Sequence, residues 1–491
     1  MWFRAWLIAT ALTSCAPGAS RNVEHGREPV PAGAAAPPTP PRAAPAPEKE
    51  SVTSDAVLVV TDPQALAEVE RGLGSFGTLL GASASEGPSL DRLVQNPAYA
   101  SIVEVLKADL ARIAREDPLA GTSVARHAHR LFDARWLDSS KARFELVAIS
   151  NRFDRLPFDD GACGEVRLVY RLSYRTSTNA EPISSRLPLT LVLELHADPP
   201  DANKSCQVVA ARWFAARGLS QSKLGEWLVG ASGPLGGGRV SPSVVARVNV
   251  NLQSVRWPAT IRPDLGGHAE YLLRTFVRDG ARMRIEPLEN TPDVARLQRQ
   301  PKLLALLLEW LKKPENLSRI DAGTAAVPRE YLSTASVSVT PHGLARRANR
   351  PFGRLFSARD LGALELSGYR NIRSAEALIR RLDDLSCPGC HQSRSLAGFH
   401  LLGEDASDTA AGNALYFGLS PHLERDLLRR RVLLERAAAG ESGLDFSRPF
   451  AERAAESDGG YGSHCGLGDP GFSAWTCDKG LSCQPHDSPR G

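Results

Sequence analysis

The feature that most restricts the fold of this sequence is a block of strand-like segments between residues 142 and 290. Val, Leu and Tyr side chains are frequent there and partly alternate with polar ones, as in β-strands. We expect a helix at 219–229 and strands at 144–149, 165–174, 187–196, 244–255 and 271–285. Segment 187–196 is nearly all apolar, which is typical of a central strand. The block therefore predicts an antiparallel or mixed sheet with helical insertions, and not a βαβ repeat.

Helical patterns flank this sheet on both sides. Apolar residues recur at helical spacing within 63–72 and 99–116, so residues 54–141 are predicted to form a helical region. A second helical region is expected at 291–440, including an amphipathic helix at 375–385 and a long helix at 420–439. The run Arg429-Arg430-Arg431 on that last helix predicts a solvated face. The fold class is α+β, with a small disulfide-rich tail at 441–491.

Composition excludes several classes of protein. Of the 491 residues, 42% are hydrophobic and 23% are charged, which excludes a disordered chain and an integral membrane bundle. The 59 basic and 55 acidic residues nearly balance, so nucleic acid is not an expected partner.

The first residues predict export. A single charge at Arg4 precedes a short apolar run, which is typical of a signal peptide at 1–14 and is too short to cross a bilayer. Leu12-Thr13-Ser14-Cys15 resembles the lipobox of bacterial lipoproteins. The resemblance implies cleavage before Cys15, its acylation, and membrane attachment in the cell envelope, at the outer membrane because Ala16 follows. An ordinary cleaved signal is the alternative. The Ala/Pro-rich residues 15–53 predict a disordered tether.

One five-residue motif predicts chemistry. Cys387-Pro388-Gly389-Cys390-His391 is C-x-x-C-H, the attachment signature of c-type haem, and over these residues the chain resembles cytochromes c. The resemblance implies thioether bonds from Cys387 and Cys390 to one haem c, and His391 as the proximal iron ligand. No Met follows Met283, so His400 is the nearest candidate for the distal ligand. The implied function is electron transfer or haem-dependent redox chemistry, with a redox partner protein.

Three other interpretations of the motif stay open. Cys387, Cys390, His391 and His400 offer four ligands for zinc, although adjacent residues rarely bind the same tetrahedral ion. The two cysteines also have the spacing of a redox dithiol. Structural disulfides are the third interpretation. A structural motif would make the chain a non-enzymatic surface lipoprotein that acts as a binding or scaffold protein, so the sequence does not decide whether it is an enzyme.

The other cysteines suggest disulfides, because thiols are oxidised in an exported protein. Cys163 and Cys206 flank strand-like segments and are expected to pair. Cys465, Cys477 and Cys483 lie in a Gly-rich tail with too few apolar residues to fold unaided, so cross-links are its expected stabiliser.

A charged cluster lies in the first half of the predicted sheet. Asn151-Arg152-Phe153-Asp154 is followed by Cys163-Gly164-Glu165-Val166-Arg167, and we expect ion pairs that order two neighbouring strands. Residues 143–196 resemble a segment of uncharacterised envelope proteins of proteobacteria, a resemblance that implies no reaction.

Overall fold

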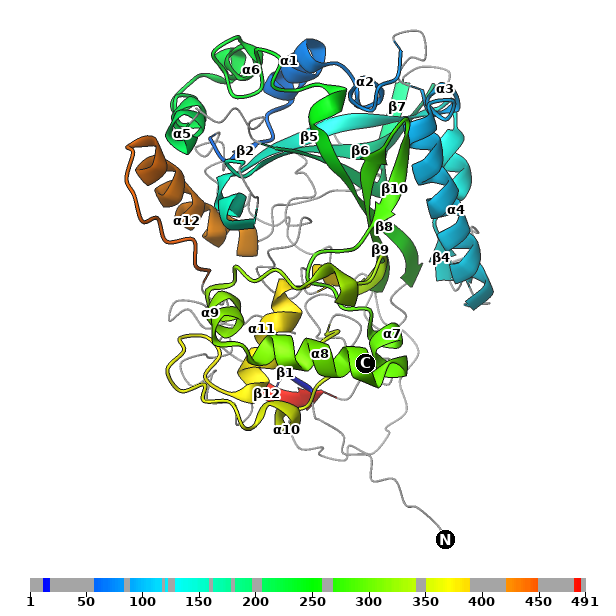
Figure 1. The fold of residues 1–491 in the computed structure, drawn as a ribbon. Coiled ribbons are helices and arrows are strands. Elements are labelled where there is room, and N and C mark those ends of the chain that lie inside the picture. Colours follow the sequence, from blue (N-terminus) through cyan, green and yellow to red (C-terminus); the bar gives the residue numbers. More distant parts are fainter. Residues whose placement is uncertain are drawn as a thin grey trace, which may run out of the picture.

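The fold is α+β, as expected from the sequence (Figure 1). The structure is a computed structural model. It describes the following residues: 12–17, 57–83, 89–116, 120–121, 129–158, 162–177, 182–196, 205–257, 268–340, 350–388, 421–448 and 481–486.

A ten-stranded sheet forms the centre of the molecule. Its main path has the order β10-β9-β8-β7-β6-β5-β2, with antiparallel neighbours throughout. These strands are β2 Val59–Val60, β5 Ala142–Arg152, β6 Glu165–Ser177, β7 Pro182–His196, β8 Val245–Trp257, β9 His268–Asp279 and β10 Arg282–Glu286. The segment expected to be central is β7, which pairs with β6 on one side and β8 on the other.

Three short strands extend this sheet. β11 Ser336–Thr340 pairs with β9 beyond the end of β10, and β4 His129–Leu131 pairs with β8 beyond the end of β7. β3 Ala120–Gly121 lies parallel to β4.

The two faces of the sheet differ in chemistry because side chains alternate along each strand. One face carries buried apolar residues, such as Leu168, Leu193 and Val248. They belong to one hydrophobic core that also includes residues of the N-terminal helices. The other face carries polar residues at the alternate positions, including Arg167 and Glu194, which are also buried.

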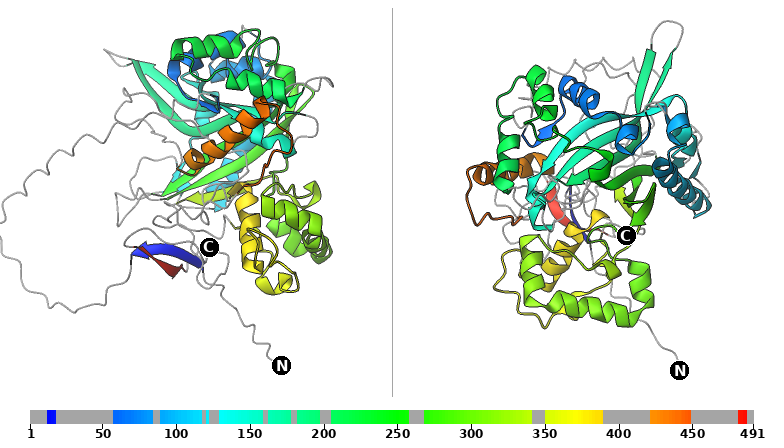
Figure 2. Two further views of the ribbon diagram at one scale, coloured as in Figure 1. Left: turned by 90° about the vertical axis from the view of Figure 1, so that its left-hand side faces the viewer. Right: turned by 45° about the horizontal axis from the view of Figure 1, so that its top comes forward.

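Six helices lie around the apolar face and its edges (Figures 1 and 2). They are α1 Pro63–Leu73, α2 Phe76–Leu79, α3 Leu90–Leu93, α4 Pro97–Glu116, α5 Cys206–Phe214 and α6 Gln221–Val229. The Asp62 side chain caps α1 by accepting a hydrogen bond from the Ala65 amide at 2.8 Å. This cap and the apolar spacing explain why the predicted helices at 63–72 and 99–116 form α1 and α4.

A second hydrophobic core lies at the other end of the sheet (Figure 2). Its helices are α7 Val294–Arg299, α8 Pro301–Lys312, α9 Pro314–Ala322, α10 Ala358–Leu361 and α11 Ala375–Leu385. Leu307, Ile320, Phe352 and Leu382 are fully buried in this core. α12 Pro421–Ala438 does not join it but packs against α5, and Leu427 and Leu434 of α12 belong to the first core.

Several sequence predictions need correction. The predicted helical region 54–141 contains α1 to α4, but it also contributes β2, β3 and β4 to the sheet and shares the first core. The single strand expected at 271–285 is a hairpin of β9 and β10, which turns at Gly280 with φ +59°. Glycine is favoured at such a positive φ. The predicted helical region 291–440 also contains a strand, β11, because this segment pairs with an open part of β9.

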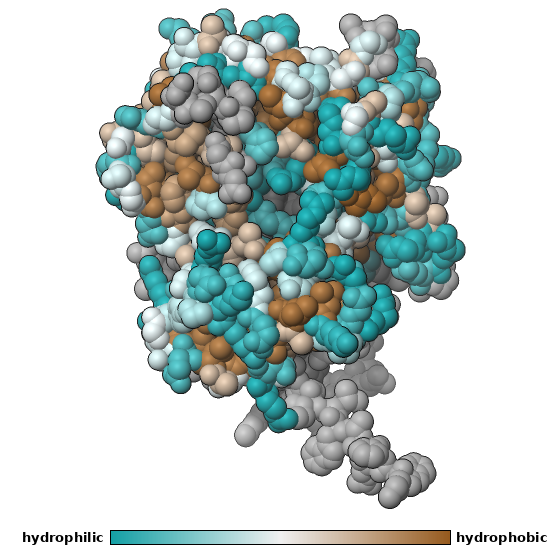
Figure 3. Space-filling view, in the orientation of Figure 1, coloured by the Kyte–Doolittle hydropathy of each residue, from teal (hydrophilic) through white to brown (hydrophobic). Residues whose placement is uncertain are grey.

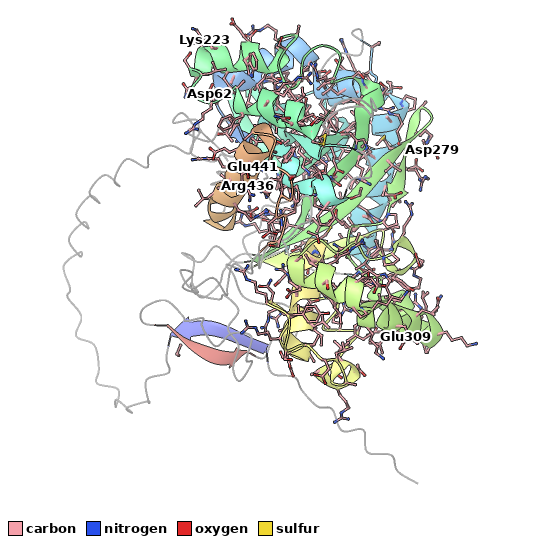
Figure 4. All side chains as sticks on the ribbon, turned by 60° about the vertical axis from the view of Figure 1, so that its left-hand side comes forward. Asp62, Lys223, Asp279, Glu309, Arg436 and Glu441 are labelled. Atoms are coloured by element: carbon pink, nitrogen blue, oxygen red, sulfur yellow. A yellow bond between two sulfur atoms is a disulfide. The ribbon has the colours of Figure 1, made fainter. Side chains whose placement is uncertain are left out.

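The boundary of the predicted tail at 441 is also wrong, because Arg448 forms a buried ion pair with Asp154 inside the body of the protein. Arg436 and Glu441, which Figure 4 labels, pair at 2.6 Å where α12 ends. Farther along the tail, β12 Leu481–His486 pairs antiparallel with β1 Leu12–Pro17, and Cys483 stands opposite Cys15 in this register. Cys465 and Cys477 lie outside the described residues.

The surface mixes polar and apolar residues. On the face shown in Figure 3, hydrophobic residues form separate patches among hydrophilic ones. Within the part of the chain that the structure describes, no helix is long and apolar enough to span a membrane.

Candidate functional site

The C-x-x-C-H motif begins where α11 ends. Ser374 caps this helix by accepting a hydrogen bond from the Ala377 amide, and Leu378 and Leu382 bury its apolar face. The helix ends at Leu385, as expected from the sequence, and Ser386 turns the chain away. The motif therefore starts from a firmly packed helix.

Three hydrogen bonds fix the backbone at the start of the motif. The amide of Cys387 donates to Thr291 Oγ1 at 2.9 Å, and the Ser338 hydroxyl donates to the Pro388 carbonyl at 3.1 Å. The Ser386 hydroxyl donates to the Asp383 carbonyl at 2.6 Å. Because Thr291 and Ser338 come from other parts of the chain, tertiary structure fixes the position of Cys387.

Cys387 lies between apolar and polar surroundings. Its side chain is buried with Leu273 and Leu288, and its sulfur lies 3.6 Å from the carbonyl oxygen of Glu289. The same residue lines a cavity of about 210 Å³. Cys390, His391 and His400 lie outside the described residues.

The cavity lies against the polar face of the sheet. Asn249, Thr275 and Ala326 line it together with four arginines and four glutamates. These charged residues are Arg155, Glu165, Arg167, Glu194, Arg247, Glu286, Glu289 and Arg329. The strand register explains this arrangement. Arg167 of β6 stands opposite Glu194 of β7, and Glu194 stands opposite Arg247 of β8.

The charged groups form a connected network. Arg155 binds Glu165 at 3.0 Å and Glu289 at 2.6 Å, and Arg167 binds Glu165 at 2.5 Å. Glu194 accepts from Arg247 at 2.6 Å and from the Asn249 amide at 3.0 Å. At the rim, Arg329 forms a two-pronged pair with Glu286.

In this network, burial and ion pairing shift the pKa values of the charged groups in opposite directions. Burial raises the pKa of Glu165, but the guanidinium groups of Arg155 and Arg167 outweigh burial and hold its pKa well below the usual value. Burial lowers the pKa of Arg155, and the carboxylates of Glu165 and Glu289 more than compensate, so its pKa lies well above the usual value. These groups are therefore ionised at neutral pH.

A second buried charge cluster lies next to this network. Arg152 binds Asp154 at 2.9 Å, within the segment where ion pairs were expected, and Arg448 binds Asp154 at 2.5 Å. Arg430 pairs with Asp426 one turn earlier in α12 at 2.7 Å. The solvated face predicted for the arginine run is therefore wrong for Arg430, which is buried against these partners.

The expected disulfide is present. Cys163 and Cys206 are bonded, with their Cα atoms 5.2 Å apart, and the bond joins the start of β6 to the first residue of α5. For zinc, the described residues contain no group of three or more His, Cys, Asp or Glu side chains arranged to hold a metal ion.

Sequence reasoning did not find most of the cavity. It found Glu165, Arg167 and Cys387, but not Glu194, Arg247 and their neighbours. One signal was available, because polar residues occupy alternate positions in apolar strands, as in the β8 sequence Val-Ala-Arg-Val-Asn-Val-Asn.

Comparisons of this chain with protein-family models, curated proteins and solved structures find no match.

Proposed function

We propose that this chain binds one haem c covalently through Cys387 and Cys390 and uses it for electron transfer or a haem-dependent redox step. His391 is the proposed proximal ligand of the iron, and His400 the proposed distal one. The observation that most supports the proposal is the position of Cys387 at the end of α11, with its backbone held by Thr291 and Ser338. The backbone at Cys387 would need no further ordering when haem is attached, although the thiol itself is buried.

The surroundings of Cys387 fit this role in part, because the cavity of about 210 Å³ beside it is too small to enclose a haem, which would lie mainly outside that cavity. Leu273 and Leu288 offer an apolar wall beside the thiol. The haem would supply one-electron chemistry, and the protein would tune it through the axial ligands and the buried charges nearby.

The proposed location is the cell envelope. We propose that Cys15 carries the lipid that anchors the chain in the outer membrane, with residues 15–53 as a tether and a redox protein as partner. The lipobox resemblance at Leu12–Cys15 supports this part of the proposal.

One set of preparations tests both parts. The full chain is expressed with c-type maturation machinery and analysed by intact mass spectrometry, absorption spectroscopy and haem staining of denaturing gels. We expect the mass of the mature chain from Cys15 plus lipid and one haem, with a Soret band. Cys387→Ser and Cys390→Ser should each weaken or abolish the covalent stain. Cys477→Ser, in the tail, is the control and should keep it. His400→Ala should keep the covalent haem but change the reduced-minus-oxidised spectrum.

A colourless product whose mass shows only polypeptide and lipid would exclude haem. The alternative would then be a non-enzymatic surface lipoprotein with a structural motif. Metal analysis and thiol counting would separate zinc from disulfides in that case.

A further inference from the structure

Around the cavity, the carboxylate acceptors are all used in hydrogen bonds, whereas not every donor is. All eight carboxylate oxygens that line it accept a hydrogen bond, and the carboxylates are those of Glu165, Glu194, Glu286 and Glu289. The donors are not all used. Within the described part of the chain, Nη1 of Arg167 has no hydrogen-bond partner, although Arg167 is only 3% exposed.

A second unused donor lies on the same face of the sheet. Asn251 is two residues beyond Asn249 on β8, so both side chains project from one face. Its Nδ2 also has no partner among the described residues and the residue is 4% exposed, but Asn251 is not one of the residues that line the cavity. Leaving a buried donor unsatisfied destabilises the folded protein.

We propose that the cavity is a binding site for a small organic carboxylate. An anionic oxygen would satisfy the unused donor of Arg167, and arginine recognises carboxylates through its planar fork of N–H groups. A cationic ligand is disfavoured because each glutamate of the lining is already engaged by arginine or asparagine. The volume of about 210 Å³ lies below the range of about 300–1,000 Å³ for drug-sized ligands, so the ligand is small.

One residue of the lining, Ala326, can be changed without removing a charged group of the network. Ala326 lines the cavity but is exposed, and its side chain has no polar group to lose. Ala326→Glu adds a negative charge at the rim and removes no member of an ion pair in the network. Ala326→Gln adds nearly the same bulk without the charge and is the matched control.

The experiment is calorimetric titration of the full chain with succinate, its uncharged diamide and inorganic phosphate. We expect succinate to bind with a dissociation constant in the millimolar range or below, and the diamide not to bind. Ala326→Glu should weaken succinate binding by about fivefold or more, and Ala326→Gln by less than about twofold. Arg167→Lys keeps the charge but loses the fork, and should weaken binding about tenfold. Arg175→Lys, on the same strand but outside the cavity, should bind as the unaltered chain does.

Several results would overturn the proposal: no binding of succinate, equal binding of the diamide, stronger binding of phosphate, or equal affinities of the two Ala326 variants. The Ala326 pair decides the question if circular dichroism shows that Arg167→Lys is unfolded. The titration is repeated with the unaltered chain expressed without c-type maturation machinery, which receives no covalent haem. Binding kept in this preparation shows that the site does not depend on haem, and binding lost there would contradict a site for a free carboxylate.

Discussion

At the scale of single residues, the protein buries charges and compensates them with partners. Asp383 is the exception among the groups near the motif. It lies on α11, and its Oδ1 accepts from the amide of Phe352 at 2.7 Å. Burial raises its pKa from 3.8 to about 8, more than the Arg350 guanidinium lowers it. The folded protein therefore holds a proton on Asp383 at neutral pH.

This raised pKa predicts a pH dependence of stability. Between about pH 4 and pH 8 the folded state keeps a proton that the unfolded chain has released, so the contribution of Asp383 to stability falls as the pH rises through this window. Asp383→Asn keeps Oδ1 as an acceptor but cannot ionise. We compare the free energy of unfolding of Asp383→Asn with that of the unaltered chain at each pH. From pH 5 to pH 8, this difference should rise in favour of the variant by about 1 kcal/mol or more.

Urea unfolding at both pH values measures this difference. Asp360→Asn is the control, because the hydrogen bonds from Ser357 lower the pKa of Asp360 and keep it ionised throughout this window. Its stability should run parallel to that of the unaltered chain. Parallel behaviour of Asp383→Asn would contradict the prediction.

At the scale of elements, covalent and polar links fix helices on the sheet. The Cys163–Cys206 disulfide ties α5 to the start of β6 across a sequence separation of 43 residues. α5 in turn packs against α12, which carries the buried pair of Asp426 and Arg430. The position of α12 therefore depends in part on this link.

Removing the disulfide should destabilise the protein. Replacing both cysteines, in Cys163→Ser/Cys206→Ser, releases a loop of this length in the unfolded chain and should cost about 2–4 kcal/mol. Denaturant unfolding under oxidising conditions measures the loss. A reductant should destabilise the unaltered chain more than the double variant. Equal stability of the two proteins without reductant would show that the bond is not a stabiliser.

At the scale of the whole molecule, one carboxylate joins distant parts of the chain. Asp154 follows the end of β5. It binds both Arg152 and Arg448, the latter in the C-terminal segment, and it lies 3.7 Å from Arg430 of α12. Burial raises the pKa of Asp154, but these guanidinium groups hold it well below its usual value. The cluster thus connects the sheet with segments nearly 300 residues later in the sequence.

Asp154→Asn should therefore be strongly destabilising. It keeps the size of the side chain but removes one of the two buried carboxylates, Asp154 and Asp426, that compensate this group of guanidinium ions, a loss of about 3–5 kcal/mol. Asp279→Asn is the control, because Asp279 is exposed and 3.9 Å from its nearest cation. It should change stability by less than about 0.5 kcal/mol. Thermal and urea unfolding measure both variants, and a loss below about 1 kcal/mol for Asp154→Asn would show that the cluster is not needed for stability.

The sequence alone determined the local elements and the place of one charged cluster. Periodicity located β6, β7, β8, α4 and α11, because side-chain alternation and helical spacing are properties of short segments. It also located a charged cluster at 151–167, although the partners of each charge came only from the structure. Tertiary structure decided what the polar face of the sheet encloses. The cavity joins four strands, the 286–289 segment and Cys387, and no local pattern records such a juxtaposition. The burial of Arg430 was likewise decided in part by Asp154, which reaches it only when the chain has folded.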